Sequence, residues 1–430
     1  MIRDSKIGPG LATVLVANNM IGSGIFLLPA SLAAIGSITV LSWGIALVGA
    51  LLVAAVLAKL GQVAPEAGGP CAYAGAAFGP HIGFQADVIY WLDGWIGNIA
   101  IDLTAVGYLA SFFPALAEPL PRAGAAIAII WALTLVNVFG ARLVCQLNSV
   151  MLLAGLLPIA LVATFGWWHF DPQIFRTSWN VTHDSGGSAV QGSLVLVFWA
   201  FLGLESASVC SAVVAKPARD IPIATIGGVL VAGIIYLASS AAIMGIIPAA
   251  TLVRSSAPFA DAMRVLLGPA AAAAVGLMAL LKALSTLCGW VLLLAQIGKS
   301  AAERRHLPAL LARTDRHGVP VHGLAVSAVL MSAVVLVTLS PTLNEQFNEL
   351  AEVSVILSLL LYVYGCGSLW HYQTALGPRG GLERYRIVAV AAILFSVGVI
   401  VLSGVKVLAL ALPLAFGTLL FYPLVRRSRR

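Results

Sequence analysis

The stretch NNMIGSGIF at residues 18–26 interrupts an apolar run that otherwise predicts one membrane-crossing helix from about residue 10 to residue 35. Two glycines, Gly22 and Gly24, flank Ser23, and each glycine in a helix interior costs about 1 kcal/mol relative to alanine. An unwound turn leaves backbone groups unpaired where lipid cannot satisfy them. We therefore predict a broken helix, whose second half begins after Gly24 and presents free N–H groups that suit a carboxylate.

Broken helices of this kind mark the substrate sites of secondary transporters. The alternative is a kinked helix whose small residues only allow close packing. The chain of 430 residues is 60% hydrophobic and only 10% charged, and its mean hydropathy is +1.00. This composition excludes an ordinary soluble globule and predicts an all-α polytopic membrane protein.

Apolar runs long enough to cross about 30 Å of hydrocarbon predict 12 transmembrane helices. They cover roughly residues 10–35, 37–58, 83–112, 123–139, 146–168, 189–214, 222–248, 269–298, 320–339, 347–371, 385–403 and 405–424. Most of the 24 Lys and Arg residues lie on the side of the N-terminus, whereas the other side carries Arg122, Arg176, Arg254, Arg264 and Lys406. By the positive-inside rule, we expect both termini in the cytoplasm.

A second interruption, WAFLGLES at residues 199–206, opens a second set of five spans as the first interruption opens the first set. Interrupted segments at matching positions of two inverted halves predict a five-plus-five transporter. The alternative is coincidence, because glycine is common in membrane helices. We expect a ten-helix transport core over 8–372, with repeats at about 8–170 and 188–372, and two additional C-terminal spans within 384–425.

Polar residues inside the spans are candidates for function, because an ionisable side chain costs at least about 2.5 kcal/mol at the centre of a membrane helix. Glu205 lies two residues after Gly203 at the second break. We expect it to exchange a proton in step with substrate; the alternative is a permanently hydrogen-bonded structural acid. The span at 83–112 carries a polar stripe that looks into protein or water and consists of Tyr90, Asp93, Gly94, Gly97, Asn98 and Asp102.

Other intramembrane residues predict further contacts. Asn98 can read a polar substrate group or bridge two helices. Asp102 and Lys282 lie at comparable depth, and we expect a buried, structural salt bridge between them. Trp199 and Trp290 each place an indole in mid-membrane. Such an indole can stack on a cation or simply pack against neighbouring side chains. Eight residues apart on nearly one helix face, Ser354 and Tyr362 would complete a polar lining.

Several functional classes are excluded. The net charge of +7 comes from scattered residues with no basic stripe, so we expect no nucleic-acid partner. The five cysteines are widely spaced and indicate neither a metal site nor a disulfide framework. Motifs typical of hydrolases, metalloproteases and nucleotide-binding enzymes are missing from the sequence, so we expect a protein that is not an enzyme and has no cofactor.

The ordered set of motifs resembles the amino acid/polyamine/organocation (APC) superfamily across nearly the whole chain. The motifs are NMIGSGIFLLP at 19–29, YW at 90–91 with WIGNIA at 95–100, W-x-F-x-G-x-ES at 199–206, PIATIGG at 222–228 and GW at 289–290. Within the APC superfamily, the sequence is most similar to bacterial arginine/agmatine antiporters, and ornithine/putrescine exchangers come next. The resemblance implies a LeuT-type inverted repeat with broken helices 1 and 6, a homodimer in the bacterial inner membrane, and one-for-one exchange.

The resemblance also implies roles for individual residues. Ser23, with Asn19 and the backbone from Ile21 to Gly24, would hold the substrate α-carboxylate. Asn98 would meet the distal guanidinium, Trp199 and Leu202 would pack on the aliphatic part, and Ser354 would add a polar contact. Trp290 would be the middle gate, and Glu205 with Tyr90 and Tyr362 the proton-sensitive inner gate. Where the family has small uncharged residues, this chain has Asp93 and Gly94, which favours a substrate of higher positive charge or a primary amine.

The leading hypothesis is therefore exchange of a cationic, arginine-like amino acid for its decarboxylated, agmatine-like amine across the lipid membrane. Such exchange would export protons indirectly, because decarboxylation inside the cell consumes a proton. The alternatives are a proton-coupled amino-acid uptake permease and an ornithine/putrescine-type polyamine exchanger on the same fold. A membrane receptor without transport is a further alternative, for which the sequence contains no recognisable signalling domain.

Overall fold

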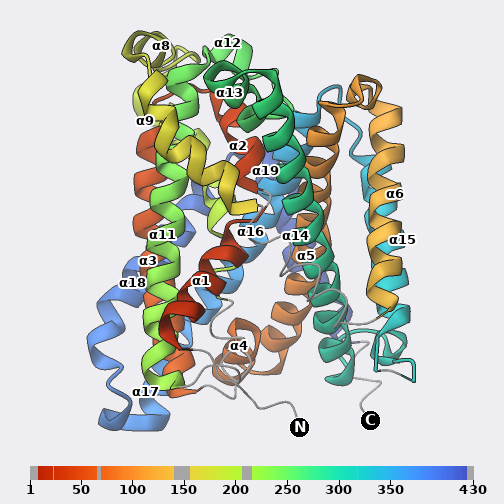
Figure 1. Cartoon of the computed structure of the whole chain (residues 1–430). Helices are drawn as coiled ribbons and strands as arrows, with labels where there is room; N and C mark the ends of the chain where they lie inside the picture. Colours follow the sequence, from red (N-terminus) through yellow and green to blue (C-terminus); the bar gives the residue numbers. More distant parts are fainter. Residues whose placement is uncertain are drawn as a thin grey trace.

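Long helices form a single bundle in the computed structural model, which describes residues 8–22, 24–64, 69–139, 155–205, 216–316 and 318–423 (Figure 1). The α-helices are α1 (Pro9–Met20), α2 (Gly24–Ala33), α3 (Thr39–Val63), α4 (Pro70–Phe78), α5 (Pro80–Ala110), α6 (Pro119–Val138), α8 (Pro172–Thr177), α9 (Gly186–Phe198), α11 (Pro217–Ile246), α12 (Ala249–Leu252), α13 (Pro258–Leu267), α14 (Pro269–Glu303), α15 (Val321–Val337), α16 (Leu343–Gly367), α17 (Leu369–Leu376), α18 (Arg386–Leu402) and α19 (Val405–Gly417). A further apolar helix covers Gly155–His169. The prediction of an all-helical chain is confirmed for the described residues.

Six of the described helices are long and apolar enough to cross a membrane. They are Thr39–Val63, Pro119–Val138, Arg219–Ile246, Pro269–Glu303, Leu343–Leu376 and Glu383–Leu402. The expected helices agree with the observed ones to within a few residues at most boundaries, while the number of 12 crossings stays a prediction.

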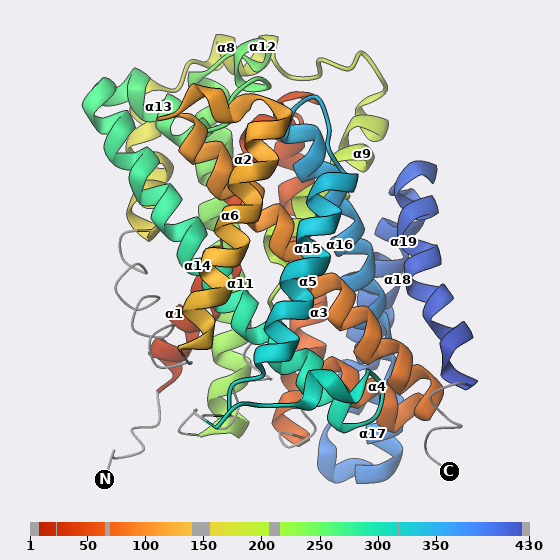
Figure 2. The same cartoon turned by 90° about the vertical axis from the view of Figure 1, so that its right-hand side faces the viewer.

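The helix α5 lies inside the bundle and packs along α14 and α16 (Figures 1 and 2). It runs for 31 residues and carries three buried acids, Asp87, Asp93 and Asp102. Buried charge is costly unless neighbouring groups satisfy it. The groups that surround each of these three acids therefore determine its role in α5.

The first predicted break is confirmed. The helix α1 ends at Met20, where the N–H of Ile21 donates to the carbonyl of Ala17 at 2.7 Å, and α2 begins at Gly24. Ser23 lies outside the described residues. The N-terminus of α2 is left with N–H groups that no preceding helical turn can satisfy.

The second predicted interruption also ends a helix. After α9, the chain makes a 3₁₀ turn, η3 (Trp199–Phe201), and Leu202 is extended. Gly203 has φ +91°, a left-handed conformation that glycine adopts without strain. The continuation at residues 206–215 lies outside the described residues.

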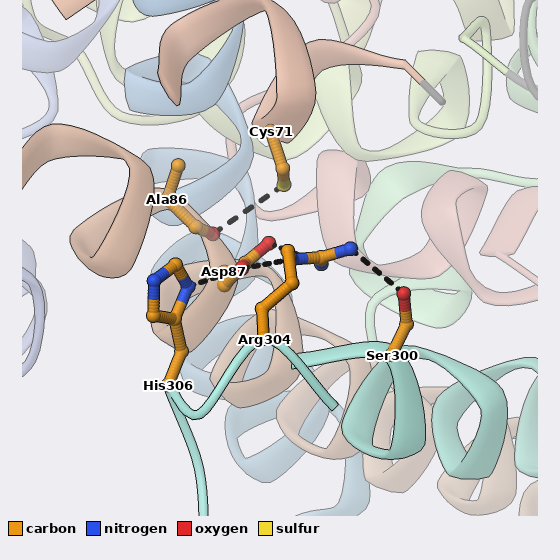
Figure 3. A network of polar contacts seen from close by, with 6 residues as sticks. All are labelled: Cys71, Ala86, Asp87, Ser300, Arg304 and His306. Atoms are coloured by element: carbon orange, nitrogen blue, oxygen red, sulfur yellow. Dashed lines mark hydrogen bonds and ion pairs between the residues drawn. The ribbon is translucent and has the colours of Figure 1, made fainter. Parts of the chain in front are cut away.

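An ion-pair network fastens the start of α5 to the end of α14 (Figure 3). The carboxylate of Asp87 accepts two hydrogen bonds from Arg304, at 2.8 and 2.7 Å, and lies 2.6 Å from Nδ1 of His306. Arg304 also donates to Ser300 at 2.8 Å. The Asp87 side chain is only 5% exposed, so the bidentate pair is partly shielded from water and stronger than a surface pair.

Asp102 and Lys282 do not form the expected salt bridge. Both are buried, but neither carboxylate oxygen of Asp102 has a hydrogen-bond partner in the part of the chain that the structure describes. The Lys282 side chain instead runs beside Gly155, where an added Cβ would lie 2.3 Å from Lys282 Cδ. The prediction was wrong because equal depth along two helices does not fix the direction in which each side chain points.

The first testable prediction concerns the Asp87 network. Asp87→Asn should lower the melting temperature of the purified protein in detergent, because a hydrogen bond to a charged group contributes about 1.5–3 kcal/mol. Glu303→Gln is the matched control, since Glu303 is next in sequence to Arg304 but forms only a surface pair with Lys299 at 3.7 Å. Equal melting temperatures for the two variants would show that the network does not stabilise the bundle.

Candidate functional site

The principal cavity lies between the two breaks, with an empty volume of about 610 Å³ including its mouth. The break between α1 and α2 forms one wall, the segment after α9 a second, and α5, α14 and α16 complete the enclosure. The lining residues are Met20, Gly22, Gly24, Tyr90, Asp93, Gly94, Gly97, Asn98, Ile101, Trp199, Ala200, Leu202, Gly203, Glu205, Thr286, Trp290, Ser354 and Ser358. Both interruptions of helical structure thus open onto one space.

Trp199 joins the break to α5 across this cavity. A Cβ on Gly24 would lie 2.4 Å from the indole Nε1, and a Cβ on Gly97 would lie 3.4 Å from Cη2 at the other end of the ring system. The indole therefore extends from the start of α2 to the middle of α5. The absence of side chains at Gly24 and Gly97 is what gives it room.

Asp93 is held by two serines of α16. The hydroxyl of Ser354 donates to Oδ1 of Asp93 and the hydroxyl of Ser358 donates to Oδ2. Ser354 and Ser358 are four residues apart, so they lie on one helix face and reach the carboxylate together. The Asp93 carboxylate is oriented by neutral hydroxyls rather than by a basic side chain.

Two polar groups in the wall have no protein partner among the described residues. They are Nδ2 of Asn98 and the hydroxyl of Thr286. Asn98 is 1% exposed. A buried donor without an acceptor costs free energy. The Nδ2 of Asn98 is therefore suited to donate a hydrogen bond to a molecule in the cavity.

Glu205 closes one side of the cavity with two tyrosines. The hydroxyl of Tyr362 donates to Oε2 of Glu205 at 2.6 Å, and the hydroxyl of Tyr90 donates to Oε1 at 3.5 Å. These residues come from three elements, the segment after η3, α16 and α5. The carboxylate therefore links the second break to the rest of the bundle through one short and one long hydrogen bond.

The structure brings most of the expected site residues together. Tyr90, Asp93, Gly94, Asn98, Trp199, Leu202, Glu205, Trp290, Ser354 and Gly24 line the cavity, and Tyr362 contacts it through Glu205. Ile21 is buried in the core and is not a lining residue. Ser23 and the side chain of Asn19 lie outside the described residues.

Sequence reasoning missed Ser358 and Thr286. Ser358 is four residues after Ser354, and Thr286 is four residues before Trp290. Each therefore lies one helical turn from a residue that was already a candidate. The periodicity of α14 and α16 was the signal that could have found both.

The cavity has two chemically different regions. The start of α2 supplies backbone N–H groups and a positive dipole end, which attract an anion. Asp93 on α5 and Glu205 in the segment after η3 supply carboxylates elsewhere in the wall, and the Trp199 indole lies between the start of α2 and the middle of α5. This arrangement suits a small molecule with a cationic group and an apolar midsection, and accommodates a carboxylate at the helix break.

Known proteins provide an independent line of evidence. A family model described as amino acid permease matches residues 10–422. The chain is 40% identical over 373 residues to the cadaverine/lysine antiporter of Escherichia coli (strain K12), covering 86% of this chain and 84% of that protein. It is 35% identical over 367 residues to the putrescine transporter PotE of the same strain, covering 85% and 84%. Identity to the PotE of Haemophilus influenzae is 34% over 367 residues, again covering 85% and 84%.

The family match and these relatives show that the protein is a membrane transporter and not an enzyme, which agrees with a cavity between two helix breaks in a bundle of apolar helices. The chain belongs to the amino acid permease family, within the APC superfamily that its motifs resemble. It is an integral membrane protein, and these relatives are bacterial transporters of amino acids and polyamines.

The packing of Trp199 generates a testable prediction. Gly24→Ala should strongly reduce uptake of radiolabelled amino acids and amines by proteoliposomes, because the added Cβ would displace the indole. Gly97→Ala should have a smaller effect, since its nearest neighbour would be Ser354 Oγ at 3.2 Å. Gly44→Ala, whose Cβ would meet nothing within 4 Å, is the control. Equal uptake by the Gly24 and Gly44 variants would show that transport does not depend on the position of the Trp199 indole.

Proposed function

We propose that this protein is a secondary active transporter that exchanges a cationic amino acid for the amine formed by its decarboxylation. The supporting observation is the cavity between the two breaks, which offers backbone N–H groups at one wall and carboxylates at another. An amino acid needs both regions, and its decarboxylated amine needs only the acidic one. One site can thus bind both partners of an exchange in turn.

The substrate pair within this class is of the lysine/cadaverine type in our proposal. The resemblance at individual motifs favours arginine and agmatine, whereas the bacterial relatives are named for cadaverine, lysine and putrescine. An ornithine/putrescine pair is the second candidate, supported by the identity to the putrescine transporter.

Individual residues have the following roles in this proposal. The backbone of the first break, which ends at Gly24 where α2 begins, holds the α-carboxylate together with Ser23 and Asn19. Trp199 and Leu202 pack on the methylene chain, and Trp290 covers the substrate as a middle gate. The distal group lies in the region lined by Asp93, Gly94, Asn98 and Ser354.

Glu205 is the proton-sensitive group of an inner gate in the same proposal. Its short bond to Tyr362 and long bond to Tyr90 tie the second break to α16 and α5. Adding a proton to the carboxylate removes an acceptor and its charge, so both bonds change strength. Protonation would then alter the relative populations of open and closed gates.

The proposal includes an architecture and an orientation. Twelve transmembrane helices form a ten-helix inverted-repeat core of the LeuT type and two C-terminal helices, and the protein assembles as a homodimer. Both termini face the cytoplasm of a bacterial cell, which is supported by the distribution of Lys and Arg between the predicted spans.

Exchange is tested by trans-stimulation. Liposomes that contain the purified protein and are preloaded with cadaverine should take up radiolabelled lysine much faster than empty liposomes. The same comparison with arginine and agmatine, and with ornithine and putrescine, identifies the substrate pair. Uptake that is equally fast into empty liposomes and is driven by a proton gradient would instead support a proton-coupled permease.

The gate is tested by removing single hydroxyl groups. Tyr362→Phe should slow transport more than Tyr90→Phe, because the lost bond is 2.6 Å rather than 3.5 Å long. Glu205→Gln should transport with a flattened dependence on pH, since the amide cannot be titrated. Tyr364→Phe is the control, because that hydroxyl bonds Gln85 at 2.7 Å. A wild-type pH profile in the Glu205 variant would assign the proton-sensitive group to another residue.

A further inference from the structure

Asp93 has an unusual position in the cavity wall. The residue is 8% exposed and lines the cavity, and its carboxylate accepts hydrogen bonds only from Ser354 and Ser358 among the described residues. The lining contains no Lys, Arg or His side chain in the part of the chain that the structure describes. A buried carboxylate is costly without an opposite charge. A cation that enters the cavity is thus the natural partner for this group.

The packing of Trp199 fixes where Asp93 lies relative to the helix break. The indole Nε1 faces Gly24 at the start of α2, and the six-membered ring faces Gly97 on α5. Ser354 Oγ, which binds Asp93, lies beside Gly97, since a Cβ there would be 3.2 Å from it. Asp93 is one helical turn before Gly97. The carboxylate and the N-terminus of α2 are therefore at opposite ends of the indole.

The hydrogen-bond geometry around Asp93 distinguishes between kinds of cation. A guanidinium group binds a carboxylate best through two parallel bonds to both oxygens. Here each Asp93 oxygen already accepts a serine hydroxyl, so two parallel guanidinium bonds would have to share both oxygens with these hydroxyls, whereas an ammonium needs only one of the oxygens. An ammonium group is a compact charge with three donors. One Asp93 oxygen and the lone pairs of the two serine hydroxyls, which have donated their own protons, supply three acceptors for it.

We propose that Asp93, positioned by Ser354 and Ser358, binds the distal primary ammonium of the substrate and selects lysine-like amino acids and diamines over guanidinium compounds. This inference rests on the proposed function, because it assigns the distal group of the transported molecule. It gives Asn98 a separate role, in which its unpartnered Nδ2 donates to an acceptor on the substrate or to water.

The test compares ligands of equal length in direct binding to the purified full-length protein in detergent. Lysine and 6-hydroxynorleucine differ only in the distal group, which is an ammonium in the first and a hydroxyl in the second. Wild-type protein should bind lysine about ten- to a hundredfold more tightly than 6-hydroxynorleucine, the range expected for a hydrogen bond to a charged group. It should also prefer lysine to arginine, which has the same α-amino acid end but a distal guanidinium. A ratio near one for either pair overturns the proposal without any variant.

Variants then assign the preference to Asp93. Asp93→Asn keeps the shape and should reduce the lysine to 6-hydroxynorleucine ratio to near one, and Ser358→Ala should reduce it partly. Asp102→Asn is the matched control, since Asp102 is a buried acid of the same helix that does not line the cavity. An unchanged ratio in the Asp93 variant, or an equal loss in the Asp102 variant, overturns the assignment.

The two proposals fail in different ways. If trans-stimulation is observed but Asp93→Asn does not change the ligand ratio, exchange is supported and the binding of the distal ammonium by Asp93 is rejected. If the ligand ratio depends on Asp93 but no trans-stimulation is observed, the binding of the distal ammonium by Asp93 is supported and exchange is rejected.

Discussion

The fold depends on one constraint, that backbone N–H and C=O groups in an apolar environment must have partners. Continuous helices such as α3 and α14 satisfy them internally. The chain departs from this solution at Ile21 and Gly22 and again at Gly203, and both places open onto the same cavity. Unsatisfied backbone is thus kept away from lipid and concentrated where a polar molecule can meet it.

The helix α5 combines support and recognition. Near its start, Asp87 is fastened to the turn after α14 by Arg304. Asp93, about two turns further on, and Asn98, about three turns further on, face the cavity, and Asp102 is buried outside it. Three acids on one helix therefore have three different surroundings, an ion pair, a pair of hydroxyls and an environment without a described partner. Their chemistry follows from these surroundings and not from residue type.

Much of this arrangement was predictable from the sequence, for identifiable reasons. Glycines beside polar residues within apolar runs predicted both breaks, and helical periodicity placed Tyr90, Asp93 and Asn98 on one face. The same periodicity did not reveal Thr286, because a threonine in an apolar helix often packs without a functional role. The pairing of Asp102 with Lys282 failed because hydropathy fixes depth but not the rotation of one helix against another. The partners of Asp93 likewise required the actual contact between α5 and α16.

The contact between Gly24 and Trp199 links the two halves of the sequence mechanically. There is no room for even a methyl group between the first residue of α2 and the indole. A shift of α2 toward the cavity therefore pushes the ring toward Gly97, and a shift of the ring toward α2 is blocked by its backbone. Each of the two breaks therefore limits how far the other can move toward the cavity, and Trp199 is the side chain through which they meet.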